Sequence, residues 1–387
     1  MHGLQILRHR MPRDRNPARK ARRQPTDGEG RELNEEELLS GNEALAESAI
    51  RAGCRFFCGY PITPQGELFE HMARHLPEVG GTFLQSESEI AGINMVYGVA
   101  AAGKRVMTAS SSTGISLMQE GISFLAATQL PCLIVNVMRA GPGLGQVRPS
   151  QADYMQATKG GGHGDYHTIV LAPSTVQDMA DLATEAFRLA DRYRTPVIIL
   201  CDGMLGQMME PVILPDTVSL SELPPKPWAV TGTKNRPRNL VLAAPYTEEE
   251  LMALNIELKK KYESIEAHEQ RWESKFLDDA EVVLVAFGTA ARISEDAVMK
   301  ARAAGLKLGL IRPITLWPFP KKAFRQVPKT LRAYIVVEMN NGQMLEDVQL
   351  AKNPDIPVHH FGKGGGWVPS TEDIYRESVA VYRRAEP

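Results

Sequence analysis

The sequence predicts an α/β protein with a parallel sheet, followed by a second and smaller α/β unit. Two observations support this fold class. Short apolar runs alternate along the chain with segments of helical periodicity, and this alternation is typical of strand–helix–strand units with right-handed crossovers. The runs are also hydrophobic on both faces, as strands are when helices cover both sides of a parallel sheet.

In the first unit, strands and helices are expected to alternate. The strands are predicted at CRFFCGY (54–60), TFLQ (82–85), RVMTAS (105–110), CLIVNVM (132–138), TIVLA (168–172) and PVIILCD (196–202). The helices are predicted over 41–52, 65–76, 88–102, 115–127 and 174–192, with Ser174 as the N-cap of the last. Ligands of such a sheet gather at the carboxyl ends of its strands, so the chemistry is expected there.

A connection and a second unit follow. Frequent prolines from Pro211 to about Lys234 indicate a connecting region. One long amphipathic helix is predicted over 248–276, because apolar residues recur at spacings of three and four: Leu251, Leu254, Leu258, Tyr262, Ile265, Trp272 and Phe276. The second unit is then predicted from strands at EVVLVAFG, LKLGLIRP, AYIVVEM and IPVHHFG and helices over 290–304 and after AYIVVEM. We therefore divide the chain into an N-terminal extension (1–38), a first α/β domain (39–247), a connecting helix (248–278) and a C-terminal α/β domain (279–387).

The N-terminal extension is expected to be disordered. Arginines cluster between Arg8 and Arg23, and an acidic patch follows from Asp27 to Glu37. The absence of an apolar segment excludes a secretory signal, and an Arg-rich transit peptide is the alternative to a disordered extension.

Composition excludes several classes of function. Lys and Arg total 44 against 46 Asp and Glu, and this net charge of −2 gives no reason to expect a nucleic-acid or membrane partner. No apolar run approaches the roughly 18 residues of a membrane span. The four cysteines are too scattered for a disulfide framework or an iron–sulfur cluster of the chain's own, and are expected to be buried thiols of a reduced, cytoplasmic protein: Cys54, Cys58, Cys132 and Cys201.

Common catalytic motifs are absent. The sequence has no phosphate-binding loop of the NTPase type, no zinc-type H-E-x-x-H and no hydrolase G-x-S-x-G. Gly141, Gly143 and Gly145 form G-x-G-x-G, with Gln146 where a dinucleotide fingerprint needs its third glycine. A nicotinamide-linked dehydrogenase is therefore an alternative with a weak signal.

Two of the four polar clusters at predicted strand ends are a rigid turn and a pair of acids. In Tyr60-Pro61-Ile62-Thr63-Pro64 the two prolines restrict the backbone and would hold the Thr63 hydroxyl at a fixed point. The alternative is that the segment is only a stiff connection between a strand and a helix. Glu87 and Glu89 begin a helix, where Ser86 and Glu89 match a capping box. Alternatively, Glu89 is buried among apolar residues and exchanges protons.

The other two clusters lie after the next strands. Thr108 to Gly114 (TASSSTG) offers hydroxyls and backbone amides at a helix start, either to a ligand or as simple caps. Arg139 closes CLIVNVM and could bind a carboxylate with its planar guanidinium, or could extend from the strand end into solvent. The four clusters place a threonine, a carboxylate, hydroxyls and an arginine on one sheet edge.

These motifs resemble a known family. YPITP, the stretch from QSESEIAGINMVYG to SSSTGISLMQEG, NVMRAGPG, GGGHGDY, RPITLWPFP and VVEMNNGQMLEDV are similar to the alpha subunit of 2-oxoacid:ferredoxin oxidoreductases, and the resemblance extends from Leu39 to the C-terminus. It implies a thiamine-diphosphate-binding domain of the pyrimidine type, followed by a domain like the C-terminal domain of transketolase. The implied reaction is the coenzyme A-dependent oxidative decarboxylation of a 2-oxo acid, with electrons passed to ferredoxin.

The resemblance also implies roles for individual residues. Glu89 matches the glutamate that hydrogen-bonds the cofactor's aminopyrimidine ring and is the catalytic residue; Glu87 is the poorer candidate. Thr63 matches a substrate-contacting hydroxyl, and Arg139 the arginine that binds the 2-oxo acid's carboxylate. The further residues implied beside the cofactor are Tyr60, Pro61, Ile62, Ser111 and Ser112.

Part of the site is missing from this sequence. The magnesium motif that grips the cofactor's diphosphate is represented only by Cys201-Asp202-Gly203. The resemblance therefore implies a beta subunit that carries the Mg²⁺ site and iron–sulfur clusters, with gamma and ferredoxin-like delta subunits beside it. A non-catalytic subunit that has lost its site is the remaining alternative class.

Substrate preference is open at this stage. The sequence after Arg139 is GPGLG rather than the GPSTG of many 2-oxoglutarate-type relatives, which favours 2-oxoisovalerate. A 2-oxoglutarate site would need a second cation, for which Arg148, Lys159 and His163 are available. His163 is as compatible with a structural role as with ligand contact.

Overall fold

The computed structural model describes residues 36–244 and 247–384 of the chain. Most of the predicted N-terminal extension lies outside these ranges. Glu37 and Leu38, which the prediction assigned to that extension, lie in a strand, because β1 (Glu37–Ser40) pairs antiparallel with β9 (Met209–Val212). Regular structure therefore begins by Glu37 rather than at Leu39.

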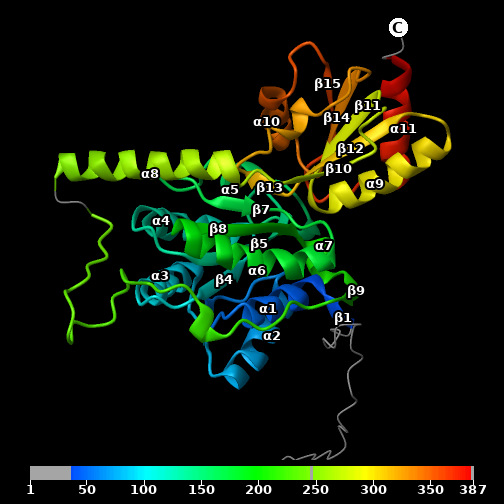
Figure 1. The fold of residues 1–387 in the computed structure, drawn as a ribbon. Helices are drawn as coiled ribbons and strands as arrows, with labels where there is room; N and C mark the ends of the chain where they lie inside the picture. The colour runs from blue at the N-terminus through cyan, green and yellow to red at the C-terminus, as the bar shows by residue number, and fades with distance from the viewer. Residues whose placement is uncertain (1–35, 245–246, 385–387) are drawn as a thin grey trace, which may run out of the picture. The chain divides into compact units, whose positions relative to one another are not determined.

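The first sheet is largely parallel. Its strands are β2 (Phe56–Gly59), β3 (Thr82–Gln85), β4 (Val106–Ser110), β5 (Cys132–Ala140), β7 (Ile169–Leu171), β8 (Pro196–Asp202) and β13 (Thr315–Trp317). They are ordered β13-β7-β8-β5-β4-β2-β3, with β13 antiparallel at one edge (Figure 1). The short strand β6 (Gln146–Pro149) turns back along the end of β5.

Along the chain, the helices of this unit alternate with its strands. They are α1 (Gly41–Arg51), α2 (Gly66–His75), α3 (Glu89–Ala101), α4 (Thr113–Ala127), α5 (Tyr154–Thr158), α6 (Val176–Tyr193) and α7 (Gly203–Gln207). α1 packs on α6, and α3 packs on α4. The strands and longer helices predicted for the first unit are all present, which confirms the α/β fold class.

The second sheet is smaller. It consists of β10 (Trp272–Lys275), β11 (Val282–Ala286), β12 (Leu308–Pro313), β14 (Ala333–Glu338) and β15 (Val358–Gly362). Their order is β10-β12-β11-β14-β15, with only β10 antiparallel. The later helices are α8 (Glu248–His268), α9 (Gly288–Ala303), α10 (Gln343–Ala351) and α11 (Thr371–Arg384). Single 3-10 turns lie at Pro77–Val79, Leu220–Glu222 and Ala323–Arg325.

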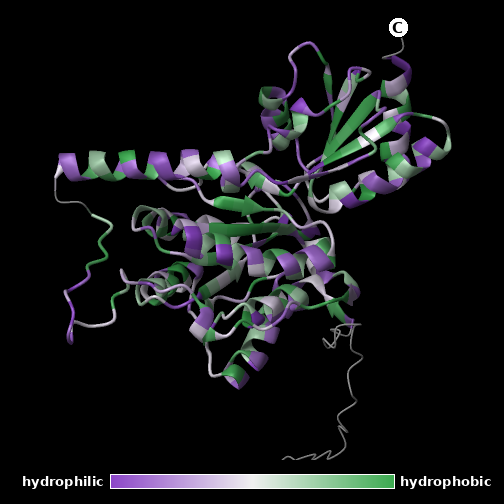
Figure 2. Cartoon of the chain, in the orientation of Figure 1, coloured by the Kyte–Doolittle hydropathy of each residue, from purple (hydrophilic) through white to green (hydrophobic). Residues whose placement is uncertain are grey.

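The cores lie on the sheets, whose inner strands are hydrophobic in Figure 2. Every residue of β4, β5 and β8 is buried, as the apolar runs predict for strands covered on both faces. β3 departs from the prediction of a buried strand: it is the edge strand, and Leu84 is 39% exposed. Within the described ranges, no helix has the length and apolar character needed to cross a membrane.

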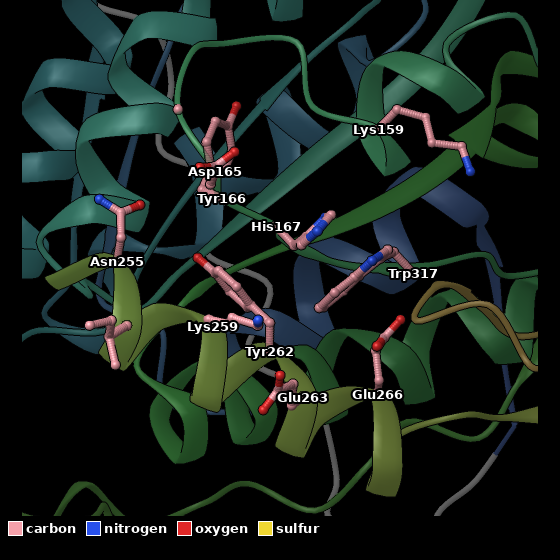
Figure 3. Close-up of a pocket in the computed structure, with 12 residues that line it drawn as sticks. Lys159, Asp165, Tyr166, His167, Asn255, Lys259, Tyr262, Glu263, Glu266 and Trp317 are labelled. Atoms are coloured by element: carbon pink, nitrogen blue, oxygen red, sulfur yellow. The ribbon is translucent and has the colours of Figure 1, made fainter. Parts of the chain in front are cut away.

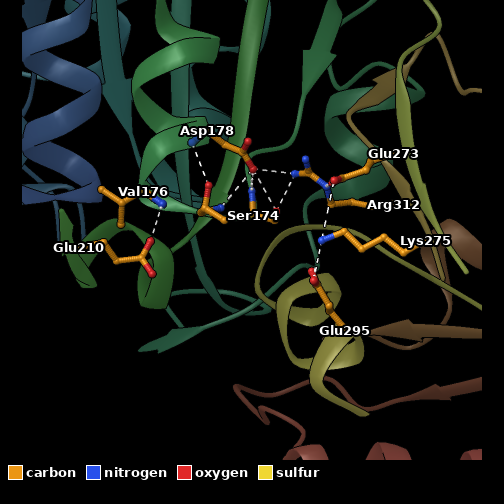
Figure 4. A network of polar contacts seen from close by, with 9 residues as sticks. Ser174, Val176, Asp178, Glu210, Glu273, Lys275, Glu295 and Arg312 are labelled. Atoms are coloured by element: carbon orange, nitrogen blue, oxygen red, sulfur yellow. Dashed lines mark hydrogen bonds and ion pairs between the residues drawn. The ribbon is translucent and has the colours of Figure 1, made fainter. Parts of the chain in front are cut away.

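A charged network links α6 to the second sheet (Figure 4). Arg312 on β12 donates through Nη1 to Ser174 Oγ and to Asp178 Oδ2, both at 2.6 Å, and through Nε to Glu273 Oε2 at 2.9 Å. Burial alone would raise the pKa of Asp178, but Arg312 and the hydrogen bonds from Ser174 outweigh it and leave this pKa below its usual value.

Two predicted boundaries are wrong. Thr175, not Ser174, is the N-cap of α6, since its hydroxyl accepts from the Asp178 backbone N (3.0 Å). The long helix ends at His268, and Trp272 begins β10, so the apolar period of 248–276 combines one helix and one strand. The periodicity of a short apolar stretch does not by itself distinguish a helix from a strand.

Candidate active site

Glu89 is the first residue of α3, at the carboxyl edge of the first sheet. Its side chain is buried (6% exposed). Its carboxylate makes no hydrogen bond or ion pair with any residue in the described ranges. Because a carboxylate in a largely buried residue is normally paired, the described residues leave Glu89 free to bind a further group.

The capping box predicted at the start of α3 is not formed. Ser88, rather than Ser86, is the N-cap and accepts from Ala91 N (3.3 Å). The Ser86 hydroxyl donates instead to the Ser88 carbonyl (2.8 Å). Glu89 is therefore not used to cap its own helix, and Glu87, beside it, is exposed to solvent.

The Glu89 carboxylate packs against the first turn of α4. A Cβ added at Gly114 would lie 2.5 Å from Glu89 Oε1 and 2.0 Å from Ser110 Oγ, so only glycine leaves room at this position. The start of α3 and the first turn of α4 both border the carboxylate, and the positive ends of two helix dipoles favour a negative charge there.

Two further polar side chains of this region have no partner. Thr108 and Ser110 are fully buried on β4, and in the described chain neither hydroxyl oxygen has a hydrogen-bond partner. Buried polar groups without partners are rare. Ser110 Oγ and Glu89 Oε1 both border Gly114, so an unpaired hydroxyl and the carboxylate lie close together at the start of α4.

Arg139, at the end of β5, is buried and mostly engaged. Nη1 donates to the Thr63 carbonyl (3.1 Å), and Nη2 donates to Thr113 Oγ1 (3.3 Å) and to the Leu144 carbonyl (3.0 Å). These bonds use three of the five N–H groups of a guanidinium. Nε is buried with no acceptor among the described residues, so Arg139 keeps donor capacity for an anionic ligand.

The Tyr60–Pro64 turn lies beside Arg139. The carbonyls of Tyr60 and Ile62 accept from Gln65, at 3.2 Å to its side chain and 3.1 Å to its backbone N. Tyr60, Pro61 and Thr63 are exposed. The contact between Thr63 and Arg139 brings two of the predicted substrate-binding residues together.

Ser111 and Ser112 are buried, but their hydroxyls are engaged within the protein. Ser111 donates to the Val137 carbonyl (2.6 Å). Ser112, with φ of 21°, donates to Asp153 Oδ2 (2.6 Å) and accepts from the Arg139 backbone N (3.0 Å). In this arrangement both serines hold β5, and thereby Arg139, rather than offering free hydroxyls to a cofactor.

Asp153 and Asn136 complete this support and were missed by sequence reasoning. Asn136 donates to Asp153 Oδ2 (3.0 Å) and accepts from Ser112 N (3.1 Å). The pKa of Asp153 is raised above its usual value, because the effect of burial is larger than the opposite effect of the hydrogen bonds from Ser112 and Asn136. The available signal was an asparagine inside the otherwise apolar strand CLIVNVM, because such a residue must be paired when buried.

The other candidate residues lie elsewhere. Lys159 pairs with Asp347 of α10, and His163 contacts the ring of Phe124, with 6.3 Å between ring centroids. Arg148 lies against Gly366 of the C-terminal part, whose added Cβ would be 2.5 Å from Arg148 Cβ. None of these three cations contacts Arg139.

The remaining weak signals have structural roles. Asp202 of the C-D-G fragment is fully buried, caps α7 and accepts from Thr289 Oγ1 (2.8 Å). The loop that begins with Gly141 leads into β6, antiparallel to β5, and not into a helix. A dinucleotide site needs the helix N-terminus after such a loop, so the dehydrogenase alternative has no geometric support.

Two cavities flank the region. One, of about 810 Å³, lies beside the first turn of α4 and is lined by Thr113, Ser116, Gly143, Asp153, Asn341 and Lys363, among others. The other, of about 610 Å³, lies between α8 and the segment before β7, where His167 stacks on Trp317 with 4.4 Å between ring centroids (Figure 3). Neither Glu89 nor Arg139 lines either of these two cavities.

The cysteines are buried thiols, as predicted. Burial raises the pKa of Cys54 to about 12 and of Cys58 to about 11, and also raises the pKa values of Cys132 and Cys201. Across residues 36–244 and 247–384, no group of three His, Cys, Asp or Glu side chains could hold a metal ion.

Comparisons with protein families agree with this geometry. The family described as pyruvate flavodoxin/ferredoxin oxidoreductase, thiamine diphosphate-binding, matches residues 47–274. Core domain II of pyruvate:ferredoxin oxidoreductase matches residues 280–374. The first match covers Glu89, Thr63 and Arg139 together.

Individual relatives are similar over most of the chain. The ketoisovalerate oxidoreductase subunit VorB of Methanothermobacter marburgensis is 50% identical over 341 residues, which is 88% of this chain and 96% of that protein. The 2-oxoglutarate synthase subunit KorA of Methanocaldococcus jannaschii is 39% identical over 368 residues, 88% of this chain and 98% of that protein.

Solved structures show the same fold. A 2-oxoglutarate:ferredoxin oxidoreductase from Magnetococcus marinus has a TM-score of 0.80 at 27% identity, and the match covers 91% of this chain and 66% of that one. A split-gene transketolase, with a TM-score of 0.56 and 13% identity over 90% of this chain and 98% of that one, is similar in fold alone. The chain therefore belongs to the 2-oxoacid:ferredoxin oxidoreductases, as a subunit of the alpha type.

Proposed function

We propose that this chain supplies the substrate and pyrimidine half of a thiamine-diphosphate-dependent active site that oxidises a 2-oxo acid, with 2-oxoisovalerate favoured, to an acyl-coenzyme A and CO₂. Electrons pass to ferredoxin. The observation that carries the proposal is the buried carboxylate of Glu89, which has no partner within the described ranges although it lies in a cradle of glycine and unpaired hydroxyls.

Glu89 is proposed to act on a proton. Its carboxylate would hold the proton of a pyrimidine ring nitrogen, in a residue that is only 6% exposed. When bound, thiamine diphosphate supplies the carbon nucleophile and the electron sink that decarboxylation of a 2-oxo acid requires. Tyr60, Pro61 and Ile62 form the rigid wall proposed to border the ring.

Arg139 and Thr63 are proposed to bind the substrate. The unpaired Nε of Arg139 offers a charged donor to the carboxylate of a 2-oxo acid. Thr63, whose carbonyl already contacts Arg139 (3.1 Å), presents an exposed hydroxyl beside it. Ser111 and Ser112 support this pair through β5 and would orient the substrate's carbonyl indirectly.

The rest of the active site is proposed to come from partners. A beta subunit would hold the diphosphate through Mg²⁺ and carry iron–sulfur clusters, with gamma and delta subunits completing the complex. The surface proposed for docking lies on α3 and α4, which pack on each other and expose Ile90, Met95 and Leu117. Exposed apolar patches of this kind mark interaction surfaces.

The test is Glu89→Gln in the reconstituted complex, with Glu87→Gln as the matched control. The glutamine is almost isosteric but cannot hold the ring proton, so we expect the rate of ferredoxin reduction to fall on the order of 10²- to 10⁴-fold. The rate of the Glu87→Gln complex should stay close to that of the unchanged complex. Subunit assembly is measured in parallel by size-exclusion chromatography.

The same experiment includes the chain alone. The purified chain is expected to be colourless and inactive, and to become active only when its beta partner is added. Undiminished turnover by the assembled Glu89→Gln complex, or activity of the isolated chain on a 2-oxo acid, would contradict the proposal.

A further inference from the structure

The loop after Arg139 has a backbone conformation that, at two positions, only glycine adopts easily. Gly143 and Gly145 have φ of +67° and +62°, a region that favours glycine. A Cβ added at Gly145 would lie 1.7 Å from the Ala140 carbonyl oxygen, and β6 then pairs back on β5. The single residue between the two glycines is Leu144, whose backbone is positioned by its hydrogen bond to Arg139.

Leu144 is bound to Arg139 through its backbone, but its side chain is free. Arg139 Nη2 donates to the Leu144 carbonyl at 3.0 Å. The Leu144 side chain is 80% exposed, so it contributes little to the folding of the described chain. Leu144 thus presents an apolar side chain to solvent, while its carbonyl contacts the guanidinium.

Leu144 is close to where the side chain of a 2-oxo acid must lie. If Arg139 binds the carboxylate, the first side-chain carbon of the substrate is only two covalent bonds from the carboxylate carbon. That carbon must therefore lie within reach of groups beside the guanidinium. Of the three cations considered for a distal carboxylate, Lys159 pairs with Asp347 and His163 packs against Phe124, whereas Arg148 is exposed and forms no ion pair within the described ranges.

We infer that Leu144 is a specificity-determining residue, whose side chain forms an apolar wall against the branched aliphatic side chain of a 2-oxo acid and disfavours a distal carboxylate. This inference rests on the proposed function and names the substrate class of that site: branched-chain aliphatic 2-oxo acids. Lys363, which lines the cavity that Gly143 also borders, is the cation that a dicarboxylate would use instead.

The experiment measures kcat/KM of the reconstituted complex on 2-oxoisovalerate, pyruvate and 2-oxoglutarate. For Leu144→Ser we expect a loss on the order of tenfold on 2-oxoisovalerate, since that is the usual effect of losing contact with one or two methyl groups. The kcat/KM on pyruvate, which has no branched side chain to contact, should change less than about twofold. Leu350→Ser is the matched control, because Leu350 is 78% exposed on α10 and away from Arg139.

Two results would overturn the inference. One is an unchanged ratio of kcat/KM between 2-oxoisovalerate and pyruvate in Leu144→Ser, and the other is a complex that prefers 2-oxoglutarate and loses that preference in Lys363→Ala. The unchanged complex separates this inference from the proposed function. If none of the three 2-oxo acids supports ferredoxin reduction by the unchanged complex, the proposed function fails. If it is active while Leu144→Ser keeps the original ratio, only this inference fails.

Discussion

Gly114 shows how one missing Cβ shapes the proposed active site. Its position, in the first turn of α4, lies against Glu89 Oε1 and Ser110 Oγ. Interiors are close-packed, so a single added methyl group must displace its neighbours. Here the neighbours are the proposed catalytic carboxylate and an unpaired hydroxyl, and the displacement would fall on the chemistry.

Gly114→Ala is therefore expected to reduce turnover at least about 100-fold, because a displacement near 1 Å at a reacting group has an effect of that order. Its overpacking should lower the free energy of unfolding by about 1–3 kcal/mol. The matched control is Gly66→Ala, since an added Cβ at Gly66 meets nothing within 4 Å. Steady-state kinetics of the complex and urea unfolding check both effects. Full activity of Gly114→Ala would show that Glu89 tolerates displacement.

At this scale the sequence predicted residue types better than their contacts. Glu89 could be proposed because an acid entered an apolar helix, yet its local pattern equally matched a cap that Ser88 in fact provides. The engagement of Ser112 with Asp153 depends on residues 41 positions apart. No local pattern specifies such a pair, because the fold brings it together.

Among the elements, the network around Arg312 has the clearest energetic role. It connects the start of α6 with β12, and its donor atoms are largely buried: the Arg312 side chain is 12% exposed. Hydrogen bonds to charged groups are worth about 1.5–3 kcal/mol each. The network therefore contributes to holding the second sheet on the first unit.

Arg312→Ala is expected to lower the free energy of unfolding by about 2 kcal/mol at neutral pH, as measured in urea. The pKa of Asp178 is lowered in the folded chain, so its contribution is present above the unfolded carboxyl pKa near 4 and is lost as pH falls through the lower folded pKa. The difference in the free energy of unfolding between Arg312→Ala and the unchanged protein should thus become smaller below about pH 4. Arg376→Ala, on an exposed pair with Glu372, is the control and should change stability by less than about 1 kcal/mol. A difference that persists undiminished at low pH would contradict this account.

Element types followed from the sequence, and element ends did not. β4, β5 and β8 could be predicted because both of their faces are apolar and buried. β3 looked the same in sequence, but the sheet order places it at the edge, and that order depends on contacts between distant segments. The end of α8 at His268 was missed because the apolar period continues into β10.

For the whole molecule, the main consequence concerns assembly. The described chain contains the pyrimidine half of the proposed site but no cluster of ligands for a metal. The helices α3 and α4, whose first turns border Glu89, also expose apolar side chains to which the proposed partner could bind. Assembly and catalysis are therefore expected to depend on the same face.

Leu117→Asp is expected to weaken binding of the beta partner by about 2 kcal/mol or more, roughly thirtyfold in affinity, because it places an unpaired charge in an apolar contact. Leu117 is 50% exposed, so the chain itself should fold normally. Leu350→Asp, at an exposed position of α10, should bind as the unchanged chain does. Size-exclusion chromatography and calorimetry of the mixed subunits provide the measurement, and equal binding by both variants would exclude this face.

The strand β13 has one more consequence. It comes from the C-terminal half of the sequence, yet it forms the outer edge of the first sheet by pairing with β7, where Thr315 lies opposite Leu171. A chain shortened to the first unit would leave the backbone groups of β7 unpaired, and bare strand edges recruit other chains. Separating the two halves would therefore turn β7 into a bare edge strand that favours aggregation of the shortened chain.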